Sequence, residues 1–65
     1  MNEIITLIWL AHPTALNEAI EAVENGTDID EAAADLMAAL YTDDTFNYYT
    51  DTELQAAVAE AITEY

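Results

Sequence analysis

The sequence predicts an all-α protein, a small single-domain bundle of about four helices that covers residues 1–65. Thirteen alanines against one glycine and one proline leave few points at which a helix has to break. Apolar side chains recur at helical spacing along much of the chain. Hydrophobic residues make up 54% of the sequence, enough to offset the ordering entropy that keeps many acidic chains unfolded.

The first expected element, Glu3 to Ala11, is apolar all round. Such a segment is typical of a central buried helix, with Trp9 in the core. Ile4, Ile5 and Ile8 leave a buried strand open as an alternative. We favour the helix, because no strong strand partner follows in the sequence.

Pro13 ends this segment, since the residue before a proline is pushed out of the α region. His12, beside it, is expected to be a loop or helix-end residue rather than a ligand or a base. Thr14 can cap a second helix, Ala15 to Asn25, and Gly26 follows where a left-handed residue is favoured. The apolar face of that helix is Leu16, Ala19, Ile20 and Val23.

A third helix follows, capped by Thr27 or Asp28, each of which has an acid three residues later. Its expected apolar face is Ile29, Ala32, Ala33, Leu36, Met37 and Leu40. Thr50 and Glu53 have the spacing of a capping box and open the last helix. The side chains expected to point inward from that helix are Leu54, Val58, Ala61, Ile62 and Tyr65.

Between these helices, Thr42 to Thr50 shows no clean period and indicates a loop or a short helical turn. Phe46, Tyr48 and Tyr49 stand in it, among acidic residues. Two interpretations stay open: the rings pack under the loop, or they anchor a partner, as tyrosines near the centre of interfaces often do.

The charge of the chain is its most unusual property. The sequence has no lysine or arginine against fourteen aspartates and glutamates, a formal charge of −14, where average composition would give roughly seven or eight basic residues. Each acidic stripe by itself is typical of a solvated helix face. However, the i+4 cations that usually stabilise such faces are absent, and Glu24 and Glu64 stand near helix C-termini, where an acid is unfavourable. This exclusion of positive charge indicates a function.

The acids follow helical spacing in the expected helices and gather around the loop. Carboxylates one turn apart lie about 5–6 Å from each other, which a row of phosphate-binding arginines can engage. A globule of this length is about 28 Å across, and duplex DNA of that length carries roughly 16 charges. The candidate partner-binding residues are Glu18, Glu21, Glu24, Asp28, Glu31, Asp35, Asp43, Asp44, Asp51 and Glu53.

Composition argues against several other classes. Nucleic acid and anionic membranes repel this chain, and the apolar run near residue 3 is shorter than the roughly 20 residues that span a bilayer. Without Cys, Ser, Lys or Arg, the common nucleophiles and phosphate clamps are missing, so we expect neither an enzyme nor a cofactor. The calcium-loop pattern fails, and a looser ion site at Asp43 and Asp44 is a minor alternative. The absence of serine also argues against an acyl carrier protein.

In size, in its lack of basic residues and in its acid stripes, the chain resembles the small acidic DNA-mimic inhibitors of bacteriophages and mobile elements, among them anti-CRISPR and anti-restriction proteins. The stripes that carry the resemblance are Glu18/Glu21/Glu24, Asp28/Glu31/Asp35 and Asp43/Asp44/Asp51/Glu53. The resemblance implies a non-enzymatic inhibitor in the bacterial cytoplasm that occupies the DNA-binding surface of a basic defence protein, such as a type I CRISPR surveillance complex.

Two other functions stay open. The chain could be an acidic adaptor, or an antitoxin-like cover for a basic partner, without mimicry of DNA. Its charge could also serve solubility alone. A domain this small, without disulfides, is marginally stable, so a homodimer that shares apolar surface is a further possibility.

Overall fold

The computed structural model describes residues 3–64, and within that range it is all helical, as predicted. Tyr65, expected to point inward, lies outside the described residues. Strands are absent from this range, which settles the first element as a helix. The elements are α1 (Glu3–Ala11), α2 (Pro13–Glu24), α3 (Ile29–Tyr41), the 3₁₀ helix η1 (Asp44–Phe46) and α4 (Asp51–Thr63).

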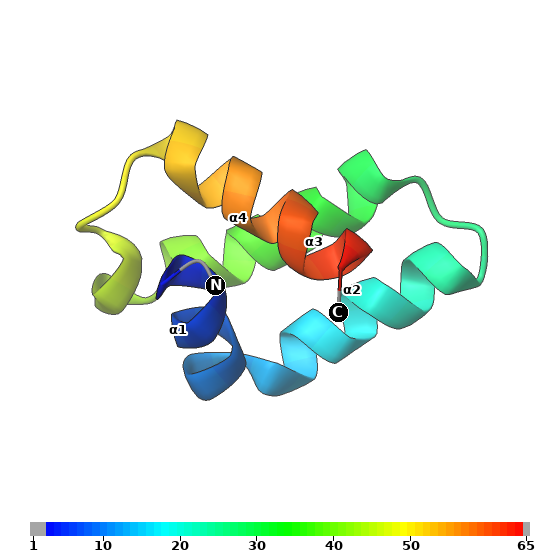
Figure 1. The fold of residues 1–65 in the computed structure, drawn as a ribbon, viewed down its shortest axis with the longest axis horizontal. Coiled ribbons are helices and arrows are strands. Elements are labelled where there is room, and N and C mark those ends of the chain that lie inside the picture. Colours follow the sequence, from blue (N-terminus) through cyan, green and yellow to red (C-terminus); the bar gives the residue numbers. More distant parts are fainter. Residues whose placement is uncertain (1–2, 65) are drawn as a thin grey trace.

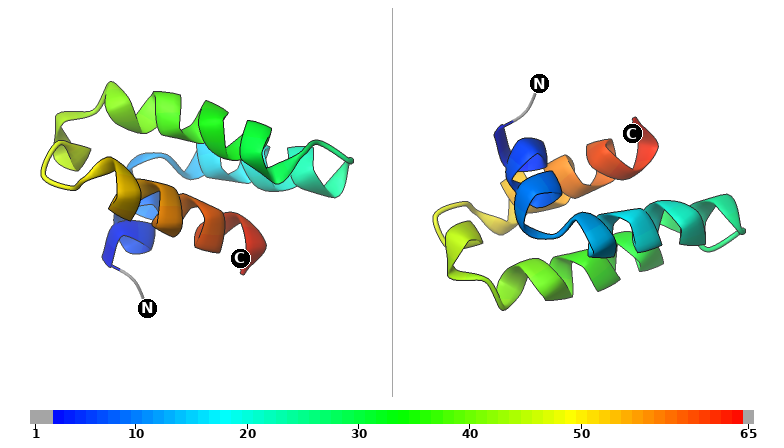
Figure 2. Two further views of the ribbon diagram at one scale, coloured as in Figure 1. Left: turned by 90° about the horizontal axis from the view of Figure 1, so that it is seen from above. Right: turned by 90° about the horizontal axis from the view of Figure 1, so that it is seen from below.

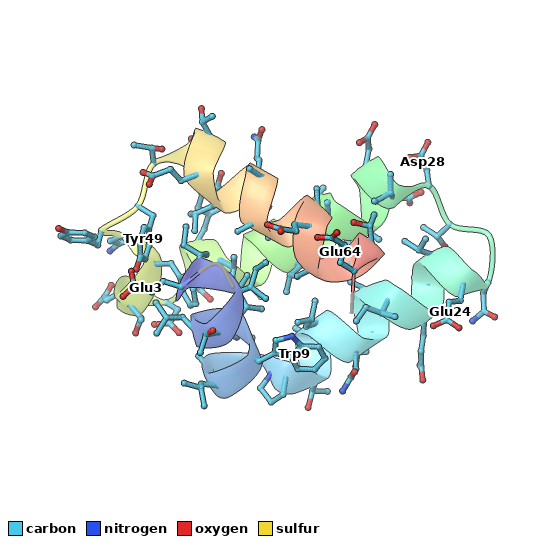
Figure 3. The ribbon with its side chains drawn as sticks, viewed as in Figure 1. Glu3, Trp9, Glu24, Asp28, Tyr49 and Glu64 are labelled. Carbon is cyan, nitrogen blue, oxygen red and sulfur yellow. The ribbon has the colours of Figure 1, made fainter. Side chains whose placement is uncertain are left out.

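The helices form one bundle of 32 × 21 × 19 Å with a radius of gyration of 10.6 Å. α2 and α3 run side by side in opposite directions, α4 packs against both, and the short α1 packs on α2 and α4 (Figures 1 and 2). Glu24 and Asp28 lie at the α2–α3 turn, whereas Glu3 and Tyr49 lie near the opposite end (Figure 3). None of the helices between residues 3 and 64 is long and apolar enough to cross a membrane.

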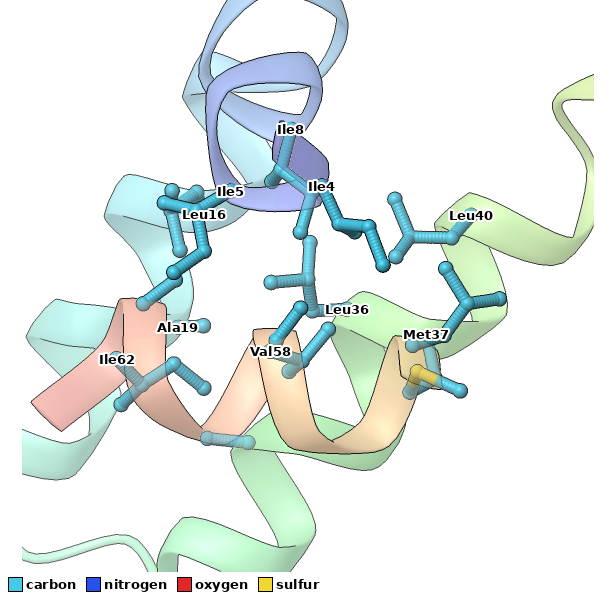
Figure 4. Close-up of a cluster of buried hydrophobic side chains, with 14 of the residues drawn as sticks. Ile4, Ile5, Ile8, Leu16, Ala19, Leu36, Met37, Leu40, Val58 and Ile62 are labelled. Atoms are coloured by element: carbon cyan, nitrogen blue, oxygen red, sulfur yellow. The ribbon is translucent and has the colours of Figure 1, made fainter. Parts of the chain in front are cut away.

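The core is made of apolar side chains from every helix (Figure 4). Among the described residues no buried side chain is polar or charged, so all the acids of this range lie at the surface or near it. Each large apolar side chain removed from water contributes about 1.5–3 kcal/mol. The buried residues of this range are Ile4, Ile5, Ile8, Leu16, Ala19, Ile20, Ala32, Leu36, Met37, Leu40, Phe46, Leu54, Ala57, Val58, Ala61 and Ile62.

The prediction that α1 is buried all round, with Trp9 in the core, is wrong. Ile4, Ile5 and Ile8 are buried, but Trp9 is 36% exposed and Leu10 is 76% exposed. The helix packs on its neighbours along one side only, and the three isoleucines occupy that side. Trp9 and Leu10 follow at angles that carry them away from it, so α1 lies at the edge of the bundle.

The predicted start of α2 is also wrong. The helix begins at Pro13 rather than Ala15, and the residue at the N-cap is His12, not Thr14, with no side-chain cap hydrogen bond. Proline suits the first helical position because its missing N–H has no partner there in any helix. α1 ends at Ala11, as expected, and α2 ends at Glu24, one residue before the predicted end.

Candidate acidic interface

The α2–α3 turn has the glycine that its backbone demands. Gly26 has φ 102°, in the left-handed region that glycine adopts at least cost. The Thr27 N–H donates to the Ala22 carbonyl at 2.9 Å, and the Gly26 N–H donates to the Val23 carbonyl at 3.1 Å. This pair of hydrogen bonds is a Schellman motif. It ends α2 and turns the chain back, so that α3 runs beside α2.

Asp28, rather than Thr27, caps α3. Its Oδ1 accepts a hydrogen bond of 2.9 Å from the Asp30 N–H, and its backbone is extended, as the cap position requires. The negative charge of an acid at this position also interacts favourably with the positive end of the helix dipole. Asp28 is therefore a candidate binding residue that already stabilises the fold.

Glu18 of α2 and Asp35 of α3, distant in the sequence, line the same shallow groove between the two helices. The groove has a volume of about 270 Å³. Small side chains dominate its lining, and it brings together one acid from each helix. Its other lining residues are Ala15, Ala19, Ala22, Ala32 and Leu36.

Two further exposed acids lie within one helical turn of this pair along the same helices. Glu31 is one turn before Asp35 on α3, and Glu21 is nearly one turn after Glu18 on α2; all four side chains are exposed. Within residues 3–64, no hydrogen bond or ion pair engages any of these four carboxylates. We call Glu18, Glu21, Glu31 and Asp35 the α2–α3 acidic face.

The acids around the loop differ from those of the α2–α3 acidic face, because they accept hydrogen bonds from other side chains of the fold. Asp44 accepts a hydrogen bond from Asn47 Nδ2 at 3.2 Å. Asp51 accepts one from the Tyr41 hydroxyl at 3.1 Å. These carboxylates are exposed, but each already has an internal donor.

Glu53 completes the capping box that the sequence predicts. The Thr50 hydroxyl accepts from the Glu53 N–H at 3.2 Å, and Glu53 Oε1 accepts from the Thr50 N–H at 3.1 Å. The prediction of an α4 start at this position is confirmed. Glu53, like Asp28, is thus a structural acid as well as a candidate for binding.

Both carboxylate oxygens of Asp43 accept hydrogen bonds within the fold. Its Oδ2 accepts a hydrogen bond from His12 Nε2 at 2.8 Å, and its Oδ1 accepts one from the Thr45 N–H at 2.9 Å. Hydrogen bonds from Thr45, and then from His12, lower the pKa of the Asp43 carboxyl. The His12 ring also lies 5.7 Å from the Phe46 ring. His12 is a helix-end residue, as expected, but its role in joining the α1–α2 junction to the loop has no signal in the sequence.

The loop aromatics divide between the two interpretations. Phe46 is 1% exposed and packs in the core. Tyr49 is half-buried, and its hydroxyl donates to Glu3 Oε2 at 3.3 Å. Tyr48 is 89% exposed, with its ring edge-on to that of Tyr49 at 5.5 Å. Packing under the loop therefore describes Phe46 and part of Tyr49, whereas Tyr48 remains available to a partner.

No group of three or more His, Asp or Glu side chains in the described part of the chain is arranged to hold a metal ion. At the pair Asp43 and Asp44, where the sequence left an ion site open, both oxygens of Asp43 have hydrogen-bond donors within the fold. Comparison of the chain with protein-family models, with curated protein sequences and with solved structures finds no match. The function is therefore inferred from the residues of this chain.

Proposed function

We propose that this protein is a non-enzymatic inhibitor that binds a basic, nucleic-acid-binding protein of bacterial defence in place of DNA. The observation that carries this proposal is the α2–α3 acidic face. Its four carboxylates have no partner within the described residues, and the sequence has no lysine or arginine to neutralise them. Exposed, unpartnered carboxylates on two adjacent helices suit a protein that binds phosphates.

The charge density of the chain supports mimicry of a duplex. Duplex DNA carries one charge per about 1.7 Å of axis, so the 32 Å length of this bundle corresponds to roughly 19 phosphate charges. The chain has 14 acids over that length. A field of this strength speeds encounter with a basic partner and repels nucleic acid itself.

The ten candidate residues take unequal parts in this proposal. Glu18, Glu21, Glu31 and Asp35 make the first contact with the partner, and Glu24 and Asp28 extend that contact toward the turn. Asp44, Asp51 and Glu53 lie beyond the other end of α3 and meet a second part of the partner. Asp43 serves the fold through His12 rather than the interface.

The first target to test is a type I CRISPR surveillance complex, because its channel for target DNA is a basic surface shaped for a duplex. Binding to the complex should compete with target DNA. It should weaken steeply with added salt, since both charge steering and close charge pairs are screened. Unchanged binding to a complex already loaded with DNA would contradict mimicry.

A matched pair of double variants tests the contact surface. The change Glu31→Gln with Asp35→Asn removes two charges from the α2–α3 acidic face, and Glu60→Gln with Glu64→Gln removes two charges from the C-terminal end of α4 and its C-cap. We expect the first pair to weaken binding about tenfold or more, or about 1.4 kcal/mol, and the second pair to change it much less. Equal losses would show that net charge, rather than this face, determines binding.

The exposed ring of Tyr48 favours one alternative, an acidic adaptor that binds its partner through aromatic contacts. In that case Tyr48→Ala would abolish binding, target DNA would not compete, and salt would have little effect. Under DNA mimicry the same substitution has a smaller effect than the Glu31 and Asp35 pair. Affinity measurements with and without competing duplex separate the two.

A further inference from the structure

One stretch of the sequence contains no acidic residue. After Glu3 the next acid is Glu18, so residues 4–17 contain no Asp, Glu, Lys or Arg. Trp9 and Leu10, two of the large apolar side chains that the structure exposes, are neighbours in this stretch. The chain therefore combines an uncharged, partly apolar surface with a strongly anionic one.

The fold places this uncharged surface on the outside of α1. Ile4, Ile5 and Ile8 face inward, which leaves Leu10 76% exposed and Trp9 36% exposed. We call the exposed residues Thr6, Trp9, Leu10 and Ala11 the α1 outer face. The exposed residues Pro13 and Thr14 continue it without charge into the start of α2.

The other exposed large apolar side chains have a different setting. The Tyr41 hydroxyl donates a hydrogen bond to Asp51, and Tyr48 packs against Tyr49, whose hydroxyl donates a hydrogen bond to Glu3. Both tyrosines thus belong to the acidic end of the molecule. The α1 outer face has no acid of its own, and aliphatic Leu10 has no polar group with which to bind a charged partner.

We propose that the α1 outer face joins two copies of this chain. Two chains of charge −14 repel each other, and the repulsion is least when they approach through the faces that carry no acid. A two-fold contact presents the same patch from both copies, so apolar meets apolar and no opposite charge is needed. A basic partner, in contrast, is drawn toward the acids and away from this face.

The available area sets the strength of this contact. A standard interface takes about 800 Å² from each partner, roughly a fifth of the 4103 Å² surface of this chain. Residues 4–17 likewise make up roughly a fifth of the sequence. Several of their side chains are buried in the core, so the area that they expose is no larger than that share of the surface. The acid-free surface is therefore at or below the standard size, and the dimer should be weak and dependent on concentration.

Sedimentation of the full chain over a range of concentrations tests this, at about 0.15 M and about 0.5 M salt. We expect a monomer–dimer equilibrium that shifts toward dimer at higher salt, because salt screens the repulsion between copies. This is opposite to the salt effect expected for a complex with a basic protein. The proposal does not depend on DNA mimicry, and neither result decides the other.

Two variants with the same change in charge provide the control. Leu10→Glu places an acid in the α1 outer face, and Tyr48→Glu places one at a site that is also highly exposed, 89%, outside it. We expect Leu10→Glu to weaken dimerisation at least tenfold and Tyr48→Glu to leave it near the wild-type value. Circular dichroism establishes that both variants are folded.

The single tryptophan gives a second readout. Burial of Trp9 between two copies should shift its fluorescence to shorter wavelength as concentration rises in the wild type, but not in Leu10→Glu. A wild type that stays monomeric at every concentration and at both salts would overturn the proposal. So would equal dimerisation by the two variants. A monomeric wild type whose target binding is lost in Leu10→Glu would assign this face to the target instead.

Discussion

Residues 4–17 and residues 18–64 build one core but present opposite surfaces. The first region exposes Trp9 and Leu10 and has no acid, whereas the second carries every acid of the chain except Glu3. Their inward sides are alike, since Ile8 from one region and Leu36 from the other are almost completely buried. The comparison shows that folding constrains the inner sides of the helices, and that the outer sides are left to differ in what they bind.

A second contrast lies within the acidic region. Asp43, Asp44, Asp51 and Glu53 accept hydrogen bonds from the fold, but the four acids of the α2–α3 acidic face accept none from the described residues. Some acids of this chain are thus explained by caps and loop contacts. The four acids of the α2–α3 acidic face have no such role, and the proposed function assigns them the first contact with the partner.

The largest expected effect separates the two sides of α1. Ile8→Ala removes a fully buried side chain and leaves a cavity in the core, which costs about 2–5 kcal/mol, enough to unfold much of a small domain. Leu10→Ala, on the exposed side, should change stability by less than about 0.5 kcal/mol. Thermal denaturation followed by circular dichroism measures both. A comparable loss in Leu10→Ala would show that the outer side of α1 is part of the monomer's core.

A smaller effect tests whether acids near α4 are structural. Thr50→Ala breaks the capping box with Glu53 and should cost about 1 kcal/mol. Thr52→Ala makes the same change two residues later, at an exposed helical position, and should cost less than about 0.5 kcal/mol. Urea denaturation distinguishes them. Equal stability of the two variants would mean that the Thr50–Glu53 contact contributes nothing to the fold.

The features that local chemistry controls could be predicted from the sequence. The helical spacing of apolar residues predicted α2, α3 and α4, and the single glycine marked the turn where a left-handed residue is needed. Thr50 and Glu53, three positions apart, predicted a helix start through their capping contact. Each of these depends on neighbours within one or two turns, which the sequence shows directly.

The errors came where the result depends on packing. In Glu3–Ala11 nearly every position is apolar, so periodicity could not show which side would face the core, and Trp9 was placed there wrongly. The contact between His12 and Asp43 joins residues 31 positions apart. In the same way, the division of the acids into engaged and unengaged groups depends on donors such as Tyr41, which only the tertiary structure brings near.

Salt should stabilise the isolated monomer by a modest amount. The unpartnered acids repel one another, because the chain has no basic side chain between them, and screening reduces this repulsion. We expect the melting temperature of the monomeric variant Leu10→Glu to rise by a few degrees between low and high salt, corresponding to about 1 kcal/mol. No change would show that the carboxylates lie too far apart to interact, and would weaken the case for a concentrated acidic face.

The smallest expected effect concerns Asp43 and appears only in acid. Hydrogen bonds from Thr45, and then from His12, lower the folded-state pKa of this carboxyl. Its ionised form therefore stabilises the fold at every pH above the unfolded value, about 4, and that contribution is lost as the pH falls through the lower folded value. Asp43→Asn should thus be less stable than wild type at neutral pH, and the difference should shrink as the pH falls below about 4. Denaturation of both proteins along a pH series measures that difference, and a gap that stays constant into acid would mean that the charge of Asp43 does not stabilise the loop.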